Sequence, residues 1–284
     1  MVRFARRAEE LGCASLWTFQ RLLHPVGSDL GPGHRSVHDP IPVLALVAGH
    51  TERIGLGTAT VCAPYTAPAL LASSMASLDV LSSGRLTVGL GMGWLPEEHI
   101  AAGAAMTQRG ERFEEYLGCL RALWTDDPVE FSGDFYRVPR SHVGPTVVQR
   151  PHPPILLGGS AEPALRRAGR LAQGWIASSG ADPSSLRASV EVVRAGAREA
   201  GRDPAALRIL ARVAGTGSDP SRSSLGSAAE IRRTFADLRA QGVTEVCVDP
   251  NLVPSIGGVE ADPDEALAEA EAIMEGVVAA ISGT

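Results

Sequence analysis

Short apolar runs alternate with stretches of helical periodicity along the whole chain, and this alternation constrains the fold more than any other feature. Strands that alternate with helices are joined by crossover helices and run parallel, so we expect an α/β fold. We expect helices over 1–11, 42–50, 68–81, 108–124, 163–172 and 263–281, with two more that begin near 183 and 227. The expected strands are 14–17, 54–58, 85–90, 155–157, 175–177, 207–213 and 245–248.

The loops distinguish between the two common α/β architectures. Turns from helix to strand are short and often contain glycine, whereas most loops from strand to helix are longer: 18–40, 62–67, 91–96, 215–227 and 249–262. In a TIM barrel the loops that follow the strands build the active site. The pattern therefore favours a TIM (β/α)8-type barrel over a doubly wound sheet, with function at the carboxyl ends of the strands.

The pattern begins on a helix and contains seven expected strands, so the first strand of an eight-stranded barrel is missing. Three explanations stay open at this point: a start codon placed too late, a truncated chain, or a barrel that is open at one position. An open edge beside buried strands is a liability, because its unpaired backbone groups can pair with another chain.

The composition excludes several classes of protein. The 284 residues are interpreted as one domain over 1–284, and the net charge of −6 argues against a nucleic-acid partner. There is no lysine, which excludes a lysine Schiff base, pyridoxal phosphate attachment and a P-loop. The four cysteines form no CxxC pair, so neither a zinc site nor a disulfide framework is expected.

The sequence also bears on where the protein is located and on whether it binds a metal. Residues 1–10 are charged and no apolar stretch reaches about 18 residues, so we expect a cytoplasmic protein without a membrane span. His24, His34, His38 and Asp39 crowd one loop, but 31–33 reads Gly-Pro-Gly and prevents a regular helical presentation of ligands. No metal site is predicted there.

The most specific motif is 81–94, which reads LSSGRLTVGLGMGW. Its glycines, Gly89, Gly91 and Gly93, follow a strand, but Trp94 stands where a dinucleotide fingerprint requires its third glycine. The motif also lies in the middle of a repeated β/α array. A dinucleotide-binding fold is therefore not indicated.

This motif and three other stretches resemble the bacterial luciferase-like family of flavin- and deazaflavin (F420)-dependent oxidoreductases. The other stretches are 5–17, 108–124 and 150–160 with its continuation to 175. The resemblance implies a TIM barrel whose missing element is the first strand. It implies an enzyme that uses F420 to transfer a hydride to or from a small organic substrate. An FMN-dependent two-component monooxygenase and a cofactor-binding paralogue without turnover stay open, and a homodimer is one arrangement found among relatives.

The resemblance also implies a cofactor site. Gly158, Gly159, Ser160 and Ala161 lie between a strand and a helix, where free backbone N–H groups and the helix dipole favour a phosphate. The ordinary alternative is a simple helix cap. In the deazaflavin branch of the family, a cis peptide at the end of the third strand faces the cofactor ring, and the matching bond is expected between Thr60 and Val61. The rest of the predicted cofactor set is Thr58, Thr60, Val61 and Gly91.

The largest departure from the family follows the first expected strand, 14–17, which resembles the family's second strand. Many relatives have an Asp-His pair where this chain has Gln20 and Arg21, and neither of these side chains exchanges protons near neutral pH. We therefore predict Arg21 as an anion-holding residue and His24, with His38 behind it, as the proton donor in a catalytic set of Gln20, Arg21 and His24. Protonation by water is the alternative.

Overall fold

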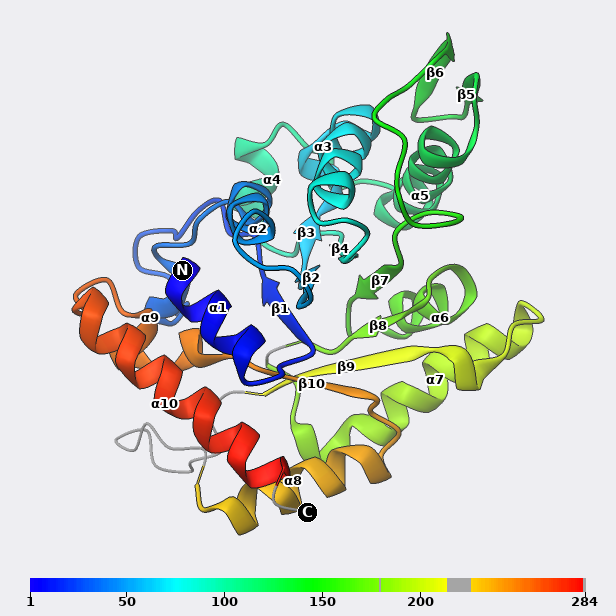
Figure 1. Cartoon of the computed structure of the whole chain (residues 1–284). Coiled ribbons are helices and arrows are strands. Elements are labelled where there is room, and N and C mark those ends of the chain that lie inside the picture. Colours follow the sequence, from blue (N-terminus) through cyan, green and yellow to red (C-terminus); the bar gives the residue numbers. More distant parts are fainter. Residues whose placement is uncertain (179, 214–225, 283–284) are drawn as a thin grey trace. The chain divides into compact units, whose positions relative to one another are not determined.

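The computed structural model describes residues 1–178, 180–213 and 226–282, and its chain divides into two compact units. Unit 2 comprises Ser15–Leu23 and Asp39–Ile155; unit 1 comprises the remaining described residues. Both units alternate parallel strands with helices (Figure 1), which confirms the α/β class. The expected domain 1–284 stays a prediction.

Unit 2 is built on a small parallel sheet. Strand β1 pairs with β2, β2 pairs with β4, and the two-residue β3 continues the pairing along the end of β4. The long helices bury their predicted faces, since Leu71, Met75 and Leu78 of α3 are almost inaccessible to solvent. The elements are β1 (Ser15–Thr18), α2 (Pro40–Ala48), β2 (Gly55–Thr58), β3 (Val61–Cys62), α3 (Pro68–Leu81), β4 (Leu86–Gly91), α4 (Pro96–Ala101) and α5 (Arg109–Thr125).

An antiparallel hairpin in unit 2 was not expected. It consists of β5 (Val129–Ser132) and β6 (Arg137–Ser141), which follow α5. The carboxylate of Glu115 on α5 accepts backbone N–H bonds from Asp134, Phe135 and Tyr136 in the turn. A side chain that precedes the hairpin by about twenty residues therefore holds its turn, and that contact cannot be read from local periodicity.

Unit 1 contains the other four parallel strands. Strands β7, β8, β9 and β10 pair in this order, although the first residue of β7, Ile155, is the last residue of unit 2. The elements are α1 (Val2–Glu10), β7 (Ile155–Gly158), α6 (Glu162–Leu171), β8 (Gly174–Ile176), α7 (Leu186–Glu199), β9 (Arg208–Val213), α8 (Ala228–Ala240), β10 (Glu245–Val248), α9 (Pro254–Gly257) and α10 (Pro263–Ser282).

The first and last helices of the chain lie side by side in unit 1 (Figure 1). Arg3 of α1 pairs with Glu271 of α10 at 2.7 Å, and Arg7 pairs with Glu275 at 2.6 Å. Helix α10 also packs on α8, where Ile231, Ile273 and Val277 form a buried cluster. Residues from both ends of the chain thus complete one unit.

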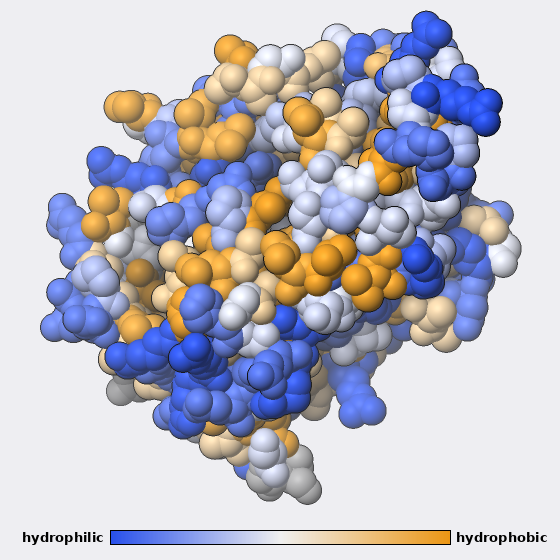
Figure 2. All heavy atoms as spheres, turned by 45° about the horizontal axis from the view of Figure 1, so that its top comes forward, coloured by the Kyte–Doolittle hydropathy of each residue, from blue (hydrophilic) through white to orange (hydrophobic). Residues whose placement is uncertain are grey.

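All seven expected parallel strands are confirmed within one or two residues, because each is an apolar run bounded by turn residues. The expected loop 215–227 lies mostly outside the described residues. Apolar side chains also reach the surface (Figure 2), and among the large ones in the described residues Val26, Ile100 and Leu70 are the most exposed. Scattered exposure of this kind is normal in folded proteins.

Candidate functional site

Two groups of residues lie at the carboxyl ends of parallel strands, one in each unit. In unit 2 the strand ends are brought level by the sheet register, which pairs Thr18 with Thr58 and Cys62 with Gly91. The segments that follow β1, β2 and β4 therefore emerge at the same edge, as a barrel-type active site requires.

Gln20 ties two of these segments together. Its backbone N–H donates to the carbonyl of Thr60 at 3.1 Å, and its side-chain Oε1 accepts from the N–H of Cys62 at 2.9 Å. Gln20 thus holds the loop after β1 against the start of β3. Gln20, one of the predicted catalytic residues, therefore has a positioning role, because its amide oxygen accepts a backbone hydrogen bond.

The cis peptide bond lies one position earlier than predicted. It joins Ala59 and Thr60, and the bond between Thr60 and Val61 is trans. The prediction relied on matching a motif of the family onto a strand end, and strand β2 stops at Thr58, so the irregular segment between β2 and β3 consists only of Ala59 and Thr60.

Of the predicted cofactor residues of unit 2, Thr60 is half-buried, and Thr58, Val61 and Gly91 are buried. Thr60 is half-buried and close to Gly91, where an added Cβ would lie 2.7 Å from its Oγ1. Thr58 and Val61 are fully buried, and the Thr58 hydroxyl exchanges two hydrogen bonds with the backbone of Gly89, at 2.8 and 2.9 Å. Thr60 and Gly91 therefore lie together at the strand ends, whereas Thr58 supports the sheet from within.

A buried carboxylate that the sequence did not single out organises this edge of unit 2. Glu98, in the first turn of α4, is 2% exposed. Its Oε1 accepts from the backbone N–H of Leu22 at 2.7 Å and of Leu23 at 3.2 Å, and its Oε2 accepts from the Tyr65 hydroxyl at 3.2 Å. An acid in the first turn of a helix ordinarily stabilises the helix start, but Glu98 fastens the loop after β1 to α4.

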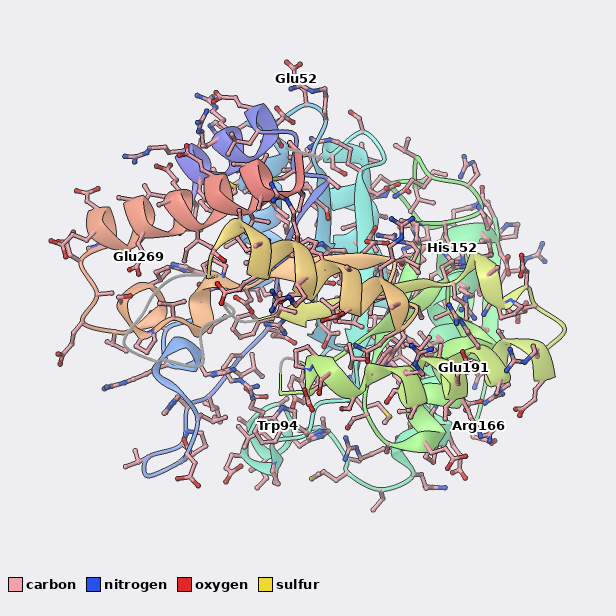
Figure 3. The ribbon with its side chains drawn as sticks, turned by 90° about the horizontal axis from the view of Figure 1, so that it is seen from below. Glu52, Trp94, His152, Arg166, Glu191 and Glu269 are labelled. Carbon is pink, nitrogen blue, oxygen red and sulfur yellow. The ribbon has the colours of Figure 1, made fainter. Side chains whose placement is uncertain are left out.

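The guanidinium of Arg21 completes this cluster. Its Nη1 lies 3.2 Å from Glu98 Oε2, and its side chain is 9% exposed. One face is covered by the ring of Trp94, whose centroid is 5.2 Å away. Trp94 lies on the turn between β4 and α4 (Figure 3) and is 60% exposed. The planar cation is therefore held between a buried carboxylate and an open aromatic surface.

The neighbouring thiol and phenol are neutral at physiological pH. Burial raises the pKa of Cys62 to about 11, and the negative charge of Glu98 adds to this effect while Arg21 opposes it. Burial also raises the pKa of Tyr65 well above its usual value, followed by the effects of Cys62 and Glu98. Cys62 is thus not an activated nucleophile, and Tyr65 acts as a hydrogen-bond donor.

Tyr65 and His99 pack closely against Gly93 in the turn after β4. Gly93 has φ +67°, and an added Cβ would lie 2.3 Å from the Tyr65 hydroxyl and 3.0 Å from His99 Nε2. His99 is 1% exposed, contacts Tyr65 edge to face, and makes no hydrogen bond through either ring nitrogen to any described residue. The glycine is required here because any side chain would displace the residues that support the turn.

The second group of residues lies in unit 1, where β7 ends and α6 begins. Gly158 and Gly159 are half-buried, and Ser160 and Ala161 are exposed. Ala161 caps α6 without a side-chain hydrogen bond, and within the described residues the N–H groups of Ser160, Ala161 and Glu162 donate to no partner. These unbonded donors at the start of a ten-residue helix can bind an anion.

Gly159 allows the chain to approach this helix start. Its φ is +131°, and an added Cβ would lie 2.8 Å from the Cβ of Ala164. Its carbonyl accepts the indole N–H of Trp175 at 2.8 Å, which fixes the turn to the neighbouring strand β8. Arg166 is a surface residue that pairs with Glu162, the first residue of α6, and with Glu199, so carboxylates already match its charge.

The structure places the remaining predicted catalytic residue, His24, in unit 1, whereas Gln20 and Arg21 belong to unit 2. His24 is half-buried, and its Nε2 lies 3.0 Å from the carbonyl oxygen of Leu30 within the same loop. His38 is exposed. No group of three or more potential metal ligands occurs among the described residues.

The chain matches the family model for luciferase-like monooxygenases over residues 1–241. It is 31% identical over 180 residues to the FMNH2-dependent dimethylsulfone monooxygenase of Pseudomonas putida, which covers 62% of this chain and 49% of that protein. It is 31% identical over 189 residues to the F420-dependent glucose-6-phosphate dehydrogenase of Amycolatopsis mediterranei, which covers 63% of this chain and 53% of that protein.

Among solved structures, the chain is similar to the crystal structure of monooxygenase RslO1 from Streptomyces bottropensis. The TM-score is 0.82 with 25% identity, and the match covers 99% of this chain and 92% of that one. The matched region spans about half the length of the two curated relatives described above.

These matches define a class of oxidoreductases built on an α/β barrel of the TIM type, as the strand pattern predicted. The chain belongs to the luciferase-like family. The family contains both F420-dependent and FMN-dependent members. None of the helices in the described residues is long and apolar enough to span a membrane.

Proposed function

We propose that this protein is an F420-dependent oxidoreductase that transfers a hydride between the deazaflavin and a small organic substrate. The observation that carries the proposal is the turn Gly158–Ala161, where unbonded N–H groups precede α6 and glycine leaves room for a phosphate. F420 and FMN both carry a phosphate. The similarity to an F420-dependent glucose-6-phosphate dehydrogenase supports F420.

In this proposal Ser160 and Ala161 of unit 1 bind the phosphate of the cofactor through their backbone N–H groups. Thr60 and Gly91 of unit 2 keep the cofactor-binding role that the resemblance of the sequence to the family implies. The bound deazaflavin supplies the two-electron chemistry. Gln20 positions the segment around Thr60 by its two hydrogen bonds.

Proton handling is assigned to His24. A hydride transfer that leaves charge on an oxygen requires a proton source. His24 is half-buried, and in its protonated form Nε2–H can donate to the Leu30 carbonyl while Nδ1–H is the proton that the ring can give up. His99, although closer in sequence to the Gly91–Trp94 turn, is enclosed by Tyr65 and Gly93 and supports the turn instead.

The second candidate function is an FMN-dependent two-component monooxygenase on the same fold. Two similarities favour it, the one to the FMNH2-dependent monooxygenase and the one to monooxygenase RslO1. In that function a separate reductase would have to supply reduced flavin, and oxygen would be consumed in the reaction.

Titration of the purified protein with F420 and, separately, with FMN tests the proposal. We expect quenching of cofactor fluorescence to show F420 bound at least about tenfold more tightly, a difference of about 1.4 kcal/mol. Tight binding of FMN without binding of F420, together with oxygen consumption on addition of reduced FMN, would establish the monooxygenase function instead.

A further inference from the structure

Arg21 is a buried cation whose hydrogen-bonding capacity is unused. Its side chain is nine-tenths buried, and neither Nε nor Nη1 makes a hydrogen bond with any described residue. The contact with Glu98 is an ion pair at 3.2 Å without hydrogen-bond alignment. A buried donor without an acceptor costs about 1–3 kcal/mol, so a ligand with acceptor oxygens is the group that this site lacks.

Glu98 lies beside the guanidinium but does not satisfy these donors. Its Oε1 accepts two backbone N–H groups and its Oε2 accepts the Tyr65 hydroxyl, while Nη1 of Arg21 lies 3.2 Å from Oε2 without forming a hydrogen bond. The carboxylate therefore fixes the position of the guanidinium and balances its charge, and the buried Nε and Nη1 keep no acceptor among the described residues.

A second arginine adds positive charge at the same turn. Arg109, at the start of α5, donates from Nη2 to the carbonyl of Gly93, and its Nε is buried without a hydrogen bond to any described residue. Two guanidinium groups thus flank the Gly93–Trp94 turn, and the single buried carboxylate of Glu98 balances one of them. The remaining positive charge favours an anionic ligand over a neutral one.

The exposed apolar side chains near Arg21 indicate which kind of ligand body fits beside the cation. Trp94, whose ring lies against the guanidinium, is 60% exposed, and Leu22 and Leu23, the next two residues after Arg21, are 44% and 38% exposed. The Trp94 ring offers an open apolar surface next to the cation, on which a planar or aliphatic body can rest.

We propose that Arg21, supported by Arg109 and positioned by Glu98, binds the oxyanion of a small apolar carboxylate, which is the substrate of this enzyme. The planar guanidinium can bind a carboxylate with two parallel hydrogen bonds. The proposal rests on the proposed function only in naming this ligand the substrate; the binding site itself depends on unit 2 alone.

The test uses benzoate as a probe and benzamide as its neutral counterpart. Both are titrated into the full chain at low salt and followed by tryptophan fluorescence and calorimetry. We expect benzoate to bind at least about tenfold more tightly than benzamide, since one charge-assisted hydrogen bond is worth that factor. Equal affinities, or no saturable binding of benzoate, would overturn the proposal.

Two variants locate the site. The double variant Arg21→Met/Glu98→Gln removes both charges, so no unpaired charge is left buried, and it should weaken benzoate binding at least about tenfold. Arg21→Lys keeps the charge but loses the planar donors and should bind with intermediate affinity. The control Arg194→Met/Glu191→Gln neutralises an exposed ion pair on α7 and should bind benzoate like the wild type. Wild-type affinity in the first double variant would overturn the proposal.

The cofactor titration separates this inference from the proposed function. If benzoate binds at Arg21 and F420 does not bind, only the proposed function fails. If F420 binds and benzoate does not, only this inference fails. Competition between benzoate and F420, with F420 weakened in the double variant, would assign the oxyanion to the cofactor and overturn its assignment to the substrate.

Discussion

The two strand-end regions of this protein differ in the groups that form them: backbone groups in unit 1 and side chains in unit 2. The turn at Gly158–Ala161 in unit 1 consists of backbone: glycines, unbonded N–H groups and a helix start. The cluster around Glu98 in unit 2 consists of side chains from the loop after β1, the segment after β3, and α4. The first region depends on chain geometry and the second on a few residues, so substitutions should affect them in different ways.

The largest effect is expected at Glu98. Replacement by Ala removes the acceptor of two backbone N–H groups and leaves Arg21 buried without a counter-charge, which should cost about 3–5 kcal/mol of unfolding free energy. The matched control is Glu97→Ala one position earlier, where the side chain is exposed and the cost should stay below about 1 kcal/mol. Urea denaturation measures both.

An equal loss in the two variants would show that the carboxylate of Glu98 acts only on the helix dipole, as the sequence suggested. The rescue variant Glu98→Gln distinguishes further. It retains an acceptor for Leu22 and Leu23 but loses the charge beside Arg21, so its stability should lie between those of the wild type and Glu98→Ala.

The next largest effect is expected on cofactor binding at the turn Gly158–Ala161. Ser160→Asp places a negative charge where the proposed phosphate binds and should weaken F420 binding on the order of several hundredfold at low salt. Ser160→Ala should change the affinity by less than about threefold, because the backbone N–H groups remain. The control Ser185→Asp makes the same change at the start of α7 and should leave binding unchanged.

If Ser160→Ala weakened binding as much as Ser160→Asp, the turn would depend on a side chain like the cluster in unit 2. If neither variant affected F420 or FMN binding, the phosphate would bind elsewhere. Thermal unfolding of each variant verifies that the fold is retained.

These regions also differ in how far the sequence predicted them. The seven strands and the turn between β7 and α6 could be predicted, since apolar runs, glycine pairs and helix starts are local signals. The role of Glu98 could not, because it depends on Leu22 and Leu23 returning to α4 across 76 and 75 positions of the sequence. The only local signal was Pro96 followed by two acids, which indicates an ordinary helix start as well.

The hairpin β5–β6 was missed for a related reason. Its strands read VEFS and RVPRS and lack an apolar run, and their turn is held by Glu115 of the preceding helix. The cis bond was placed one position late because a motif transferred from relatives does not locate the last residue of β2. In each case the deciding contact or boundary is not encoded by local periodicity.

A third prediction tests whether His24 contributes to catalysis. His24→Ala should lower turnover on the order of a hundredfold without changing the affinity for F420, and added imidazole should restore part of the rate. His38→Ala alters the second candidate of the same loop and should have the smaller effect, because His38 is exposed. Unchanged turnover and an unchanged pH profile in both variants would show that solvent or the substrate supplies the proton.

The smallest effect is expected at His152, a buried titratable residue that belongs to neither strand-end region. His152, labelled in Figure 3, is 8% exposed. Its Nδ1 lies 2.7 Å from the carbonyl oxygen of Pro153, and its ring lies against that of Trp124. Burial lowers its pKa from the ordinary value of 6.5. The folded chain therefore favours the neutral ring, whereas the unfolded chain binds a proton more readily in the window just below pH 6.5.

The sign of the pH dependence follows from this difference. The stability that the neutral His152 contributes is complete above the unfolded pKa and is lost as the pH falls from there through the lower folded pKa. The unfolding free energy of the wild type, measured relative to that of His152→Gln, should therefore decrease between about pH 8 and about pH 5, because glutamine does not titrate. A difference between the two proteins that is independent of pH, or that grows on acidification, would mean that the His152 ring is protonated as easily in the folded chain as in the unfolded one.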